Sequence, residues 1–196
     1  MNAHDDLAPS PWISRFAALV PVGARVLDLA AGRGRHARFF AGRGAQVLAV
    51  DRDAEALRAL AGVPGVTARV LDLESGTWPL AGERFDAIVV VNYLHRPQYP
   101  HLRAALAADG VLLYETFAMG NEAYGRPTNP DHLLCEGELL SLAALPPAPM
   151  TVVAFEQGVT PGATRPAVVQ RIAAVGSASP WPPALGPAAA RPPYGR

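Results

Sequence analysis

The stretch that decides the fold is Val26–His36, which reads Val-Leu-Asp-Leu-Ala-Ala-Gly-Arg-Gly-Arg-His. Its apolar beginning, interrupted only by Asp28, predicts a short buried strand. Gly32 and Gly34 then allow a tight turn and a close approach of a ligand to the backbone. In open parallel sheets, ligands bind at the carboxyl ends of the strands. The turn is therefore a candidate binding site.

Apolar runs and helical patterns alternate along the rest of the chain. Strands are expected over 25–29, 45–50, 66–73, 85–91, 110–117, 151–157 and 167–174, and helices over 11–20, 35–41, 53–61, 97–108 and 136–145. Repeated strand–helix–strand units predict a parallel sheet with right-handed crossovers, and the last two strands predict an antiparallel hairpin at its edge. We expect a doubly wound, Rossmann-like α/β domain over 1–176 with a seven-strand, mainly parallel sheet, and a disordered Pro/Ala-rich tail over 177–196.

The composition excludes several chemistries. All 17 basic residues other than histidine are arginines, balanced by 17 Asp and Glu. Without lysine, a Schiff base with pyridoxal phosphate and a P-loop are excluded. The single cysteine, Cys135, excludes disulfides and is interpreted as a small buried hydrophobe. No metal site is expected from the histidine spacing, and the balanced charge gives no reason to expect nucleic acid. Without a signal peptide or an apolar span, no membrane association and a cytoplasmic location are expected.

Polar residues stand at or near the carboxyl ends of the five expected parallel strands. In strand order they are Asp28, Asp51, Asp72, Asn92 and Glu115. Asp51 is placed to accept hydrogen bonds from two ribose hydroxyls, as in NAD sites, and Asp72 to accept one from an adenine amino group. Asp28 suits an ammonium or sulfonium better than a pyrophosphate. Its carboxylate also needs a partner, from the cofactor or a backbone N–H.

These features resemble the class I S-adenosylmethionine-dependent methyltransferases over roughly Val22–Ala118. VLDLAAGRG resembles their first motif, LDLE (71–74) their adenine-contacting segment, and FDAIVVVNYLHR (85–96) their fourth motif. The GRGRHA turn and the short chain are most similar to the small tellurite-resistance-like methyltransferases. The resemblance implies S-adenosylmethionine as cofactor and a small molecule as methyl acceptor. The cofactor-binding residues it implies are Asp28, Ala30, Gly32, Gly34, Arg35, Asp51, Arg52, Asp72, Leu73 and Asn92. Ala30 replaces the usual first glycine, which is compatible with a backbone outside the left-handed region.

Methyl transfer from a sulfonium needs in-line positioning, and a base only where the acceptor carries a proton. Catalytic candidates are therefore His95, Tyr93 and Glu115. His95 is the best general base by its intrinsic pKa, with a locally packed loop histidine as the alternative. Tyr93 either shapes the pocket wall or is a core aromatic, and Glu115 either lies under the substrate or is a buried anchor.

The polar segment 118–134 is either a lid or binding loop, or a solvated connection. Candidate acceptor-binding residues are Tyr124 and Arg126 within it, and Arg96 before it.

Two other functions stay open. An NAD-dependent oxidoreductase shares the Gly-rich turn and Asp51, but Asp28, Ala37 at the third glycine position and the absence of a Tyr-x-x-x-Lys pair count against it. A non-catalytic S-adenosylmethionine-binding protein keeps the same fold and pocket without turnover.

Overall fold

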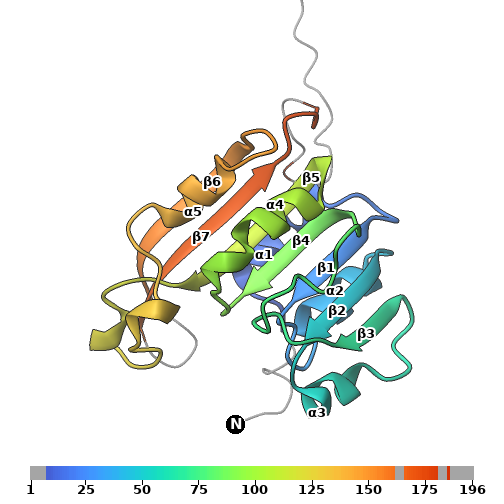
Figure 1. Cartoon of the computed structure of the whole chain (residues 1–196), viewed down its shortest axis with the longest axis horizontal. Coiled ribbons are helices and arrows are strands. Elements are labelled where there is room, and N and C mark those ends of the chain that lie inside the picture. The colour runs from blue at the N-terminus through green and yellow to red at the C-terminus, as the bar shows by residue number, and fades with distance from the viewer. Residues whose placement is uncertain (1–7, 162–165, 181–184, 186–196) are drawn as a thin grey trace, which may run out of the picture.

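The computed structural model describes residues 8–161, 166–180 and 185, which fold around one seven-stranded sheet (Figure 1). The strands are β1 (Arg25–Leu29), β2 (Gln46–Asp51), β3 (Val66–Val70), β4 (Phe85–Val91), β5 (Leu106–Phe117), β6 (Thr151–Thr160) and β7 (Ala167–Val175). Their order is β3-β2-β1-β4-β5-β7-β6, with the first five parallel and β7 antiparallel to both β5 and β6. The predicted fold class is confirmed.

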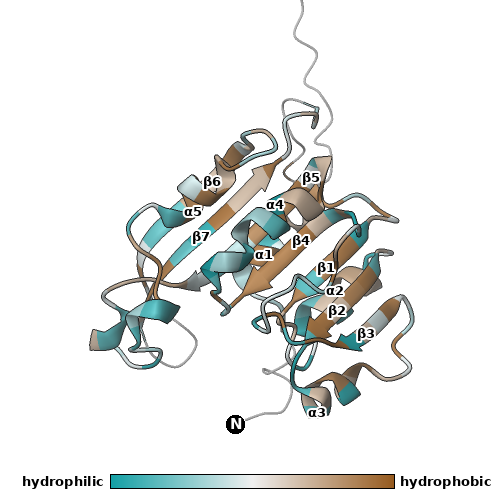
Figure 2. Ribbon diagram, viewed as in Figure 1, coloured by the Kyte–Doolittle hydropathy of each residue, from teal (hydrophilic) through white to brown (hydrophobic). Residues whose placement is uncertain are grey.

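Helices cover both faces of the sheet. They are α1 (Pro11–Phe16), α2 (Arg35–Gly42), α3 (Ala54–Leu57), α4 (Tyr99–Ala105) and α5 (Glu138–Ala143), and short 3-10 turns are η2 (Ala17–Leu19), η3 (Arg58–Leu60), η4 (Arg96–Gln98), η5 (Asn121–Ala123) and η6 (Pro130–His132). Side chains alternate between the two faces of a strand. One face of β4 therefore joins the core formed with α1, α2 and α3, and the other joins the core formed with α4 and α5. Figure 2 shows the central strands brown along most of their length, as burial on both faces requires.

Several boundaries differ from the sequence-based expectations. The third strand ends at Val70, so Asp72 lies in the loop after it rather than on the strand. The helix expected over 97–108 is shorter because Leu106 already pairs with Phe85 and begins β5. The first helix ends at Phe16 and continues as a 3-10 turn. The predicted tail lies largely outside the described residues. In the described part of the chain, no helix combines the length and the apolar character that a membrane span requires.

The strand order reverses between β1 and β4. From β1 the chain continues to β2 and β3 on one side, and from β4 it continues to β5 on the other side. This topological switch point is where ligands bind in doubly wound sheets. The Gly-rich turn after β1 and the segment Asn92–His95 after β4 both lie there. The topology thus brings together two of the motifs singled out in the sequence.

Candidate cofactor and acceptor site

A cavity of 420 Å³ opens at the carboxyl ends of the five parallel strands. The described residues that line it are Ala30, Asp51, Arg52, Leu71, Asp72, Leu73, Glu74, Asn92, Tyr93, Leu94, Thr116, Phe117, Pro127 and His132. A second cavity of 340 Å³ lies beside it, lined by Asp28, Ala30, Ala31, Gly32, Arg33, Arg35, His36, Val91 and Asn92. The two cavities share Ala30 and Asn92, so they meet at the switch point between β1 and β4.

Ala30 and Asn92 have an unusual backbone. Their φ angles are 55° and 57°, and no other non-glycine residue in the described chain has a positive φ. The left-handed conformation costs an L-residue about 1–2 kcal/mol, less for asparagine. The condition under which an alanine was expected to fit this position, a backbone outside the left-handed region, is therefore not met. The neighbouring bonds hold the strain in place: Ala31 N–H donates to the Val50 carbonyl at 3.0 Å, and Asn92 N–H to the Glu115 carbonyl at 2.9 Å.

The two glycines of the turn serve different purposes. Gly32 has a φ of 53° and open space where a Cβ would stand, and its N–H donates to Asp51 Oδ2 at 2.7 Å. Gly34 has a φ of 77°, and a Cβ there would come within 2.6 Å of Leu60 Cγ. Gly32 therefore lies open to the smaller cavity, whereas Gly34 permits the close packing of α2 against η3.

Asp51 ends β2 with its carboxylate in the larger cavity. Besides Gly32, it accepts a hydrogen bond from Asp53 N–H at 2.9 Å. These two bonds fix the carboxylate, and each oxygen keeps a further lone pair for a ligand hydroxyl. Asp53, not Asp51, caps α3, because its Oδ1 accepts from Glu55 N–H and Ala56 N–H at 2.9 and 3.0 Å.

Asp28 is 2% exposed and accepts a hydrogen bond from Ala37 N–H at 2.8 Å. The expected backbone partner is thus confirmed. Burial raises the pKa of Asp28 to about 7, although the Ala37 bond and the charge of Arg35 act in the opposite direction. Because its pKa is close to neutral, the Asp28 carboxyl would ionise when a cation enters the smaller cavity.

The segment after β3 forms one wall of the larger cavity. Asp72 Oδ1 accepts from Glu74 N–H at 2.9 Å, which shapes the turn, and Leu73 is buried against the core. Arg52, on the neighbouring loop, forms an exposed ion pair with Glu74 at 3.9 Å. This wall combines the apolar side chain of Leu73 with carboxylate acceptors.

Tyr93, which follows β4, lines the same cavity near Glu74 and Asp72. Its hydroxyl is buried and has no hydrogen-bond partner among the described residues. Burial, together with the nearby Glu74 and Asp72 charges, raises its pKa. Its carbonyl accepts from Tyr114 Oη at 2.8 Å, which fixes its backbone. Tyr93 both packs against the core and lines the cavity, and its unsatisfied hydroxyl is available to a bound molecule.

Other predicted residues are not brought into this cavity. His95 is half-buried and is not among its lining residues. Glu115 lies on the α1 side of the sheet, where it accepts from Ser10 Oγ at 2.8 Å and stands 3.2 Å from Arg171 Nε. This geometry favours the anchor role for Glu115 over a substrate role. Tyr124 and Arg126 are exposed and also lie outside the lining.

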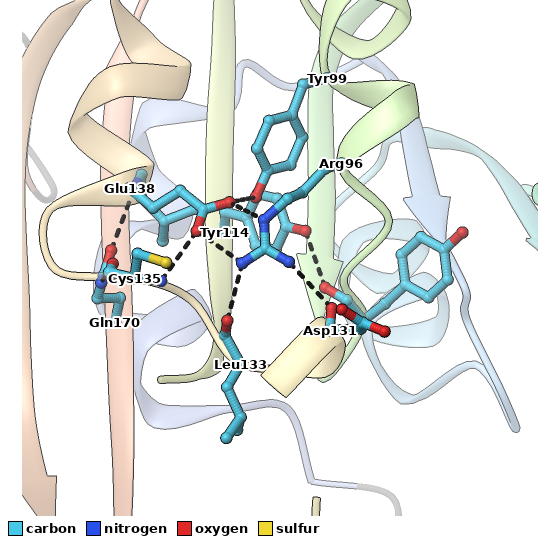
Figure 3. Close-up of polar contacts among 10 residues, drawn as sticks. Arg96, Tyr99, Tyr114, Asp131, Leu133, Cys135, Glu138 and Gln170 are labelled. Carbon is cyan, nitrogen blue, oxygen red and sulfur yellow. Dashed lines mark hydrogen bonds and ion pairs between the residues drawn. The ribbon is translucent and has the colours of Figure 1, made fainter. Parts of the chain in front are cut away.

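Arg96 is engaged inside the protein rather than in the cavity. Its guanidinium forms a two-point ion pair with Glu138, with both N···O distances at 2.8 Å, and also donates to the Asp131 and Leu133 carbonyls (Figure 3). The role predicted for Arg96 as a substrate ligand therefore has little support in this geometry.

Sequence reasoning missed part of the lining. Thr116, Phe117, Pro127 and His132 all contribute to the larger cavity. The signal available was the polar segment 118–134, which contains both Pro127 and His132. Cys135, expected to be buried, is exposed; it lies in the loop before α5, outside both apolar cores. The described residues contain no group of His, Cys, Asp and Glu side chains suited to a metal ion.

Comparisons with known proteins find similarity in sequence over part of the chain and in fold over most of it. Residues 26–110 match the model of a family described as a methyltransferase domain. TehB from Haemophilus influenzae is similar with a TM-score of 0.66 and 17% identity, over 82% of this chain and 60% of that one. A TehB-like S-adenosylmethionine-dependent methyltransferase from Corynebacterium glutamicum gives a TM-score of 0.57 and 20% identity, over 82% and 84% of the two chains.

A third structure is the 1,6-didemethyltoxoflavin-N1-methyltransferase of Burkholderia thailandensis, crystallised with that compound and S-adenosylhomocysteine. It gives a TM-score of 0.57 and 23% identity, over 88% of this chain and 83% of that one. This chain spans only 60% of the length of TehB. A search of curated proteins finds no match. The resemblance seen in the sequence is confirmed: residues 26–110 match the methyltransferase domain, and the sheet has the fold of S-adenosylmethionine-dependent methyltransferases.

Proposed function

We propose that this protein binds S-adenosylmethionine across the two joined cavities and transfers its methyl group to a small-molecule acceptor. One observation carries the proposal: the two cavities meet at Ala30 and Asn92, with a fixed carboxylate on each side of the junction. The cofactor supplies a methyl group on a positively charged sulfur between an adenosyl half and an amino-acid half. A two-chambered site with separate acceptors suits such a molecule.

The larger cavity suits the adenosyl half. Asp51 is held by two backbone N–H groups, so its carboxylate is already oriented to accept from two ribose hydroxyls. Leu73 offers an apolar contact to an adenine ring, and Asp72 offers an acceptor for its amino group. Arg52 and Glu74, which lie at the same wall, border this region.

The smaller cavity suits the amino-acid half. Asp28 is positioned to pair with an ammonium group, and its desolvated carboxyl gains from a cation there. Gly32 allows close approach of the backbone, and Arg33 and Arg35 offer guanidinium groups to a carboxylate. Both charges of an amino-acid zwitterion thus find a complementary partner in one cavity.

The remaining wall of the larger cavity is left for the acceptor. Phe117 and Pro127 give it apolar surface, while Tyr93, Thr116 and His132 supply polar groups. A direct displacement needs the acceptor atom in line with the transferred methyl, which these side chains achieve by confinement. Where the acceptor carries a proton, His132 is better placed than His95 to receive it, because it lines the cavity.

The charges of the larger cavity restrict the acceptor. Its described lining contains the carboxylates of Asp51, Asp72 and Glu74 against the single guanidinium of Arg52, which Glu74 already pairs with. This field repels an anion. We infer a neutral or cationic acceptor, with nitrogen or a phenolic oxygen as the methylated atom, rather than an oxyanion. The similarity to the 1,6-didemethyltoxoflavin-N1-methyltransferase supports a small-molecule acceptor.

Titration calorimetry tests the cofactor. S-adenosylmethionine and S-adenosylhomocysteine are expected to bind and NAD is not; the reverse pattern would favour the oxidoreductase alternative. Asp51→Ala removes the charged acceptor and should lower the affinity for S-adenosylhomocysteine at least about tenfold. The matched control is Asp53→Ala, which removes the cap of α3 but no cavity carboxylate. Equal affinities of the wild type and Asp51→Ala would contradict the ribose assignment.

Radiolabelled methyl transfer to amines, phenols, thiols and a small oxyanion then tests catalysis. Transfer to an amine or phenol is expected, whereas transfer only to the oxyanion would contradict the charge argument. Tight cofactor binding without any transfer would favour the non-catalytic binder. With an acceptor identified, His132→Ala should slow turnover more than His95→Ala.

A further inference from the structure

Arg96 and Glu138 form a link between elements that are distant in sequence. Arg96 begins η4, directly after the β4 loop, and Glu138 begins α5. Arg96 Nε and Nη2 donate to the two carboxylate oxygens of Glu138, both at 2.8 Å. This planar two-point geometry is specific to arginine and fixes both side chains. Figure 3 shows the pair at the centre of a group of polar contacts.

The same guanidinium also hydrogen-bonds to the backbone on both sides of His132. Arg96 Nη1 donates to the Asp131 carbonyl at 3.1 Å, and Nη2 donates to the Leu133 carbonyl at 2.8 Å. His132 lies between these two anchored residues and lines the larger cavity. The position of its imidazole is therefore tied to Arg96, although Arg96 does not itself line the cavity.

Glu138 is also saturated with donors. Besides Arg96, it accepts from Tyr99 Oη at 2.9 Å and from Cys135 N–H at 2.9 Å (Figure 3). Burial alone would raise the pKa of Glu138, but these hydrogen bonds keep it below its usual value. The carboxylate thus joins α4 to the start of α5 in its charged form.

Two further residues, Gln170 and Tyr114, connect this part of the protein to the sheet. Gln170 on β7 donates to the Cys135 carbonyl and accepts from Leu139 N–H at 3.1 Å. Tyr114 on β5 donates to the Tyr93 carbonyl at 2.8 Å. The start of α5 is therefore fixed to β7, and the backbone of Tyr93, which lines the larger cavity, is fixed to β5.

We propose that Arg96 and Glu138 are positioning residues that place the segment Pro127–His132 as the acceptor-side wall of the cavity. They act through Asp131 and Leu133 and do not bind the acceptor. The inference rests on the proposed function, which assigns this wall of the cavity to the methyl acceptor. Its test uses the mobility and geometry of the segment, which are measurable whether or not the cofactor binds.

Hydrogen exchange measured by mass spectrometry on the full chain provides the first readout. In Arg96→Met and in the milder Glu138→Gln, peptides that cover 118–135 should exchange at least about tenfold faster. Peptides from β1, β2 and β4 should keep their wild-type rates. The matched control is Arg69→Met, which breaks an ion pair with Glu83 that lies away from the loop. Wild-type exchange over 118–135 in both pair variants would overturn the proposal, and so would equal acceleration along the whole chain.

A second readout separates positioning from simple stabilisation. The His132 imidazole resonance, assigned with His132→Gln, should shift in Arg96→Met while the His36 and His101 resonances stay in place. Arg96→Lys keeps a positive charge but cannot span the carboxylate and both carbonyls, so the resonance should shift there too. An unshifted His132 resonance in Arg96→Met and Arg96→Lys would overturn the proposal.

Cofactor affinity gives the third readout. S-adenosylhomocysteine should bind the pair variants within twofold of the wild type, because the adenosyl and amino-acid sides of the cavities are untouched. A failure of the wild type to bind it would refute the proposed function but leave the exchange and resonance results standing. A tenfold or larger loss of affinity in Arg96→Met and Glu138→Gln alone would overturn the positioning role and make the pair part of the cofactor site.

Discussion

Replacing Asp28 by asparagine should change how the stability of this protein depends on pH. The carboxyl is buried; the hydrogen bond from Ala37 N–H and the Arg35 charge lower its pKa, and the Asp51 charge raises it. Burial outweighs the two lowering effects and raises the pKa from 3.8 to about 7. Between pH 3.8 and about pH 7, the folded protein therefore keeps a proton on Asp28 that the unfolded chain has released.

This difference gives the sign and size of the effect. Below pH 3.8 the carboxyl is protonated in both states, and well above pH 7 it is ionised in both. Between these values the unfolded state binds fewer protons, so the stability of the wild type falls as the pH rises. At about 1.4 kcal/mol per pH unit, the full difference amounts to roughly 4 kcal/mol. Asp28→Asn has no such titration.

Urea unfolding of both proteins between pH 4.5 and pH 8 measures the effect. The free energy of unfolding of Asp28→Asn minus that of the wild type should grow by about 3 kcal/mol over this range. Any fixed effect of the amide is the same at every pH, and His36 titrates in both proteins, so neither contributes to the trend of the difference with pH. A difference that stays constant, or shrinks with rising pH, would refute the reasoning from burial.

Further changes test other parts of the site. Gly34→Ala should destabilise by about 2–4 kcal/mol, from a left-handed backbone plus the clash with Leu60, whereas Gly32→Ala should cost only about 1–2 kcal/mol; equal losses in thermal unfolding would contradict the clash. Burial lowers the pKa of His36 from 6.5 to about 3, so between these values only the unfolded chain binds a proton there. The free energy of unfolding of the wild type, measured with urea, should therefore fall relative to that of His36→Gln by about 2 kcal/mol from pH 7 to pH 5; a constant difference between the two proteins would contradict this. At pH 6.5, binding of S-adenosylhomocysteine should release about three quarters of a proton from the wild type and less from Asp28→Asn, measured by calorimetry in buffers of different ionisation enthalpy; equal proton release would remove Asp28 from the ammonium site.

The fold and the strand-end carboxylates were predictable because their signals are local. A run such as Phe85–Val91 is apolar at nearly every position, which indicates a strand buried on both faces. Asp51 ends a strand and Asp53 precedes a helix. The hydrophobic pattern of the sequence is therefore enough to assign Asp51 to the cavity and Asp53 to the helix cap. Boundaries were less predictable, since β5 starts at Leu106 through pairing with a strand some twenty residues earlier.

The acceptor side was not predictable for a related reason. Arg96 and Glu138 are 42 residues apart, and nothing in the sequence around either indicates the other. An exposed arginine after a strand is read as a ligand contact until its partner is known. His132 likewise has no local feature that distinguishes it from His95; only the folding of its loop over the strand ends places it in the cavity.

The strained backbone at Ala30 and Asn92 connects these local and non-local parts. Both residues directly follow the strands that flank the switch point, and both line the two cavities. An alanine in the left-handed region is destabilising, so it persists only where the surroundings determine it. The bond from Ala31 to β2 and the bond from Asn92 to β5 supply that determination. The sheet therefore fixes the junction at which the cofactor and acceptor regions meet, while the Arg96–Glu138 pair fixes the wall opposite. If this division is correct, changes at the junction should alter cofactor affinity, and changes at the pair should alter only the acceptor side.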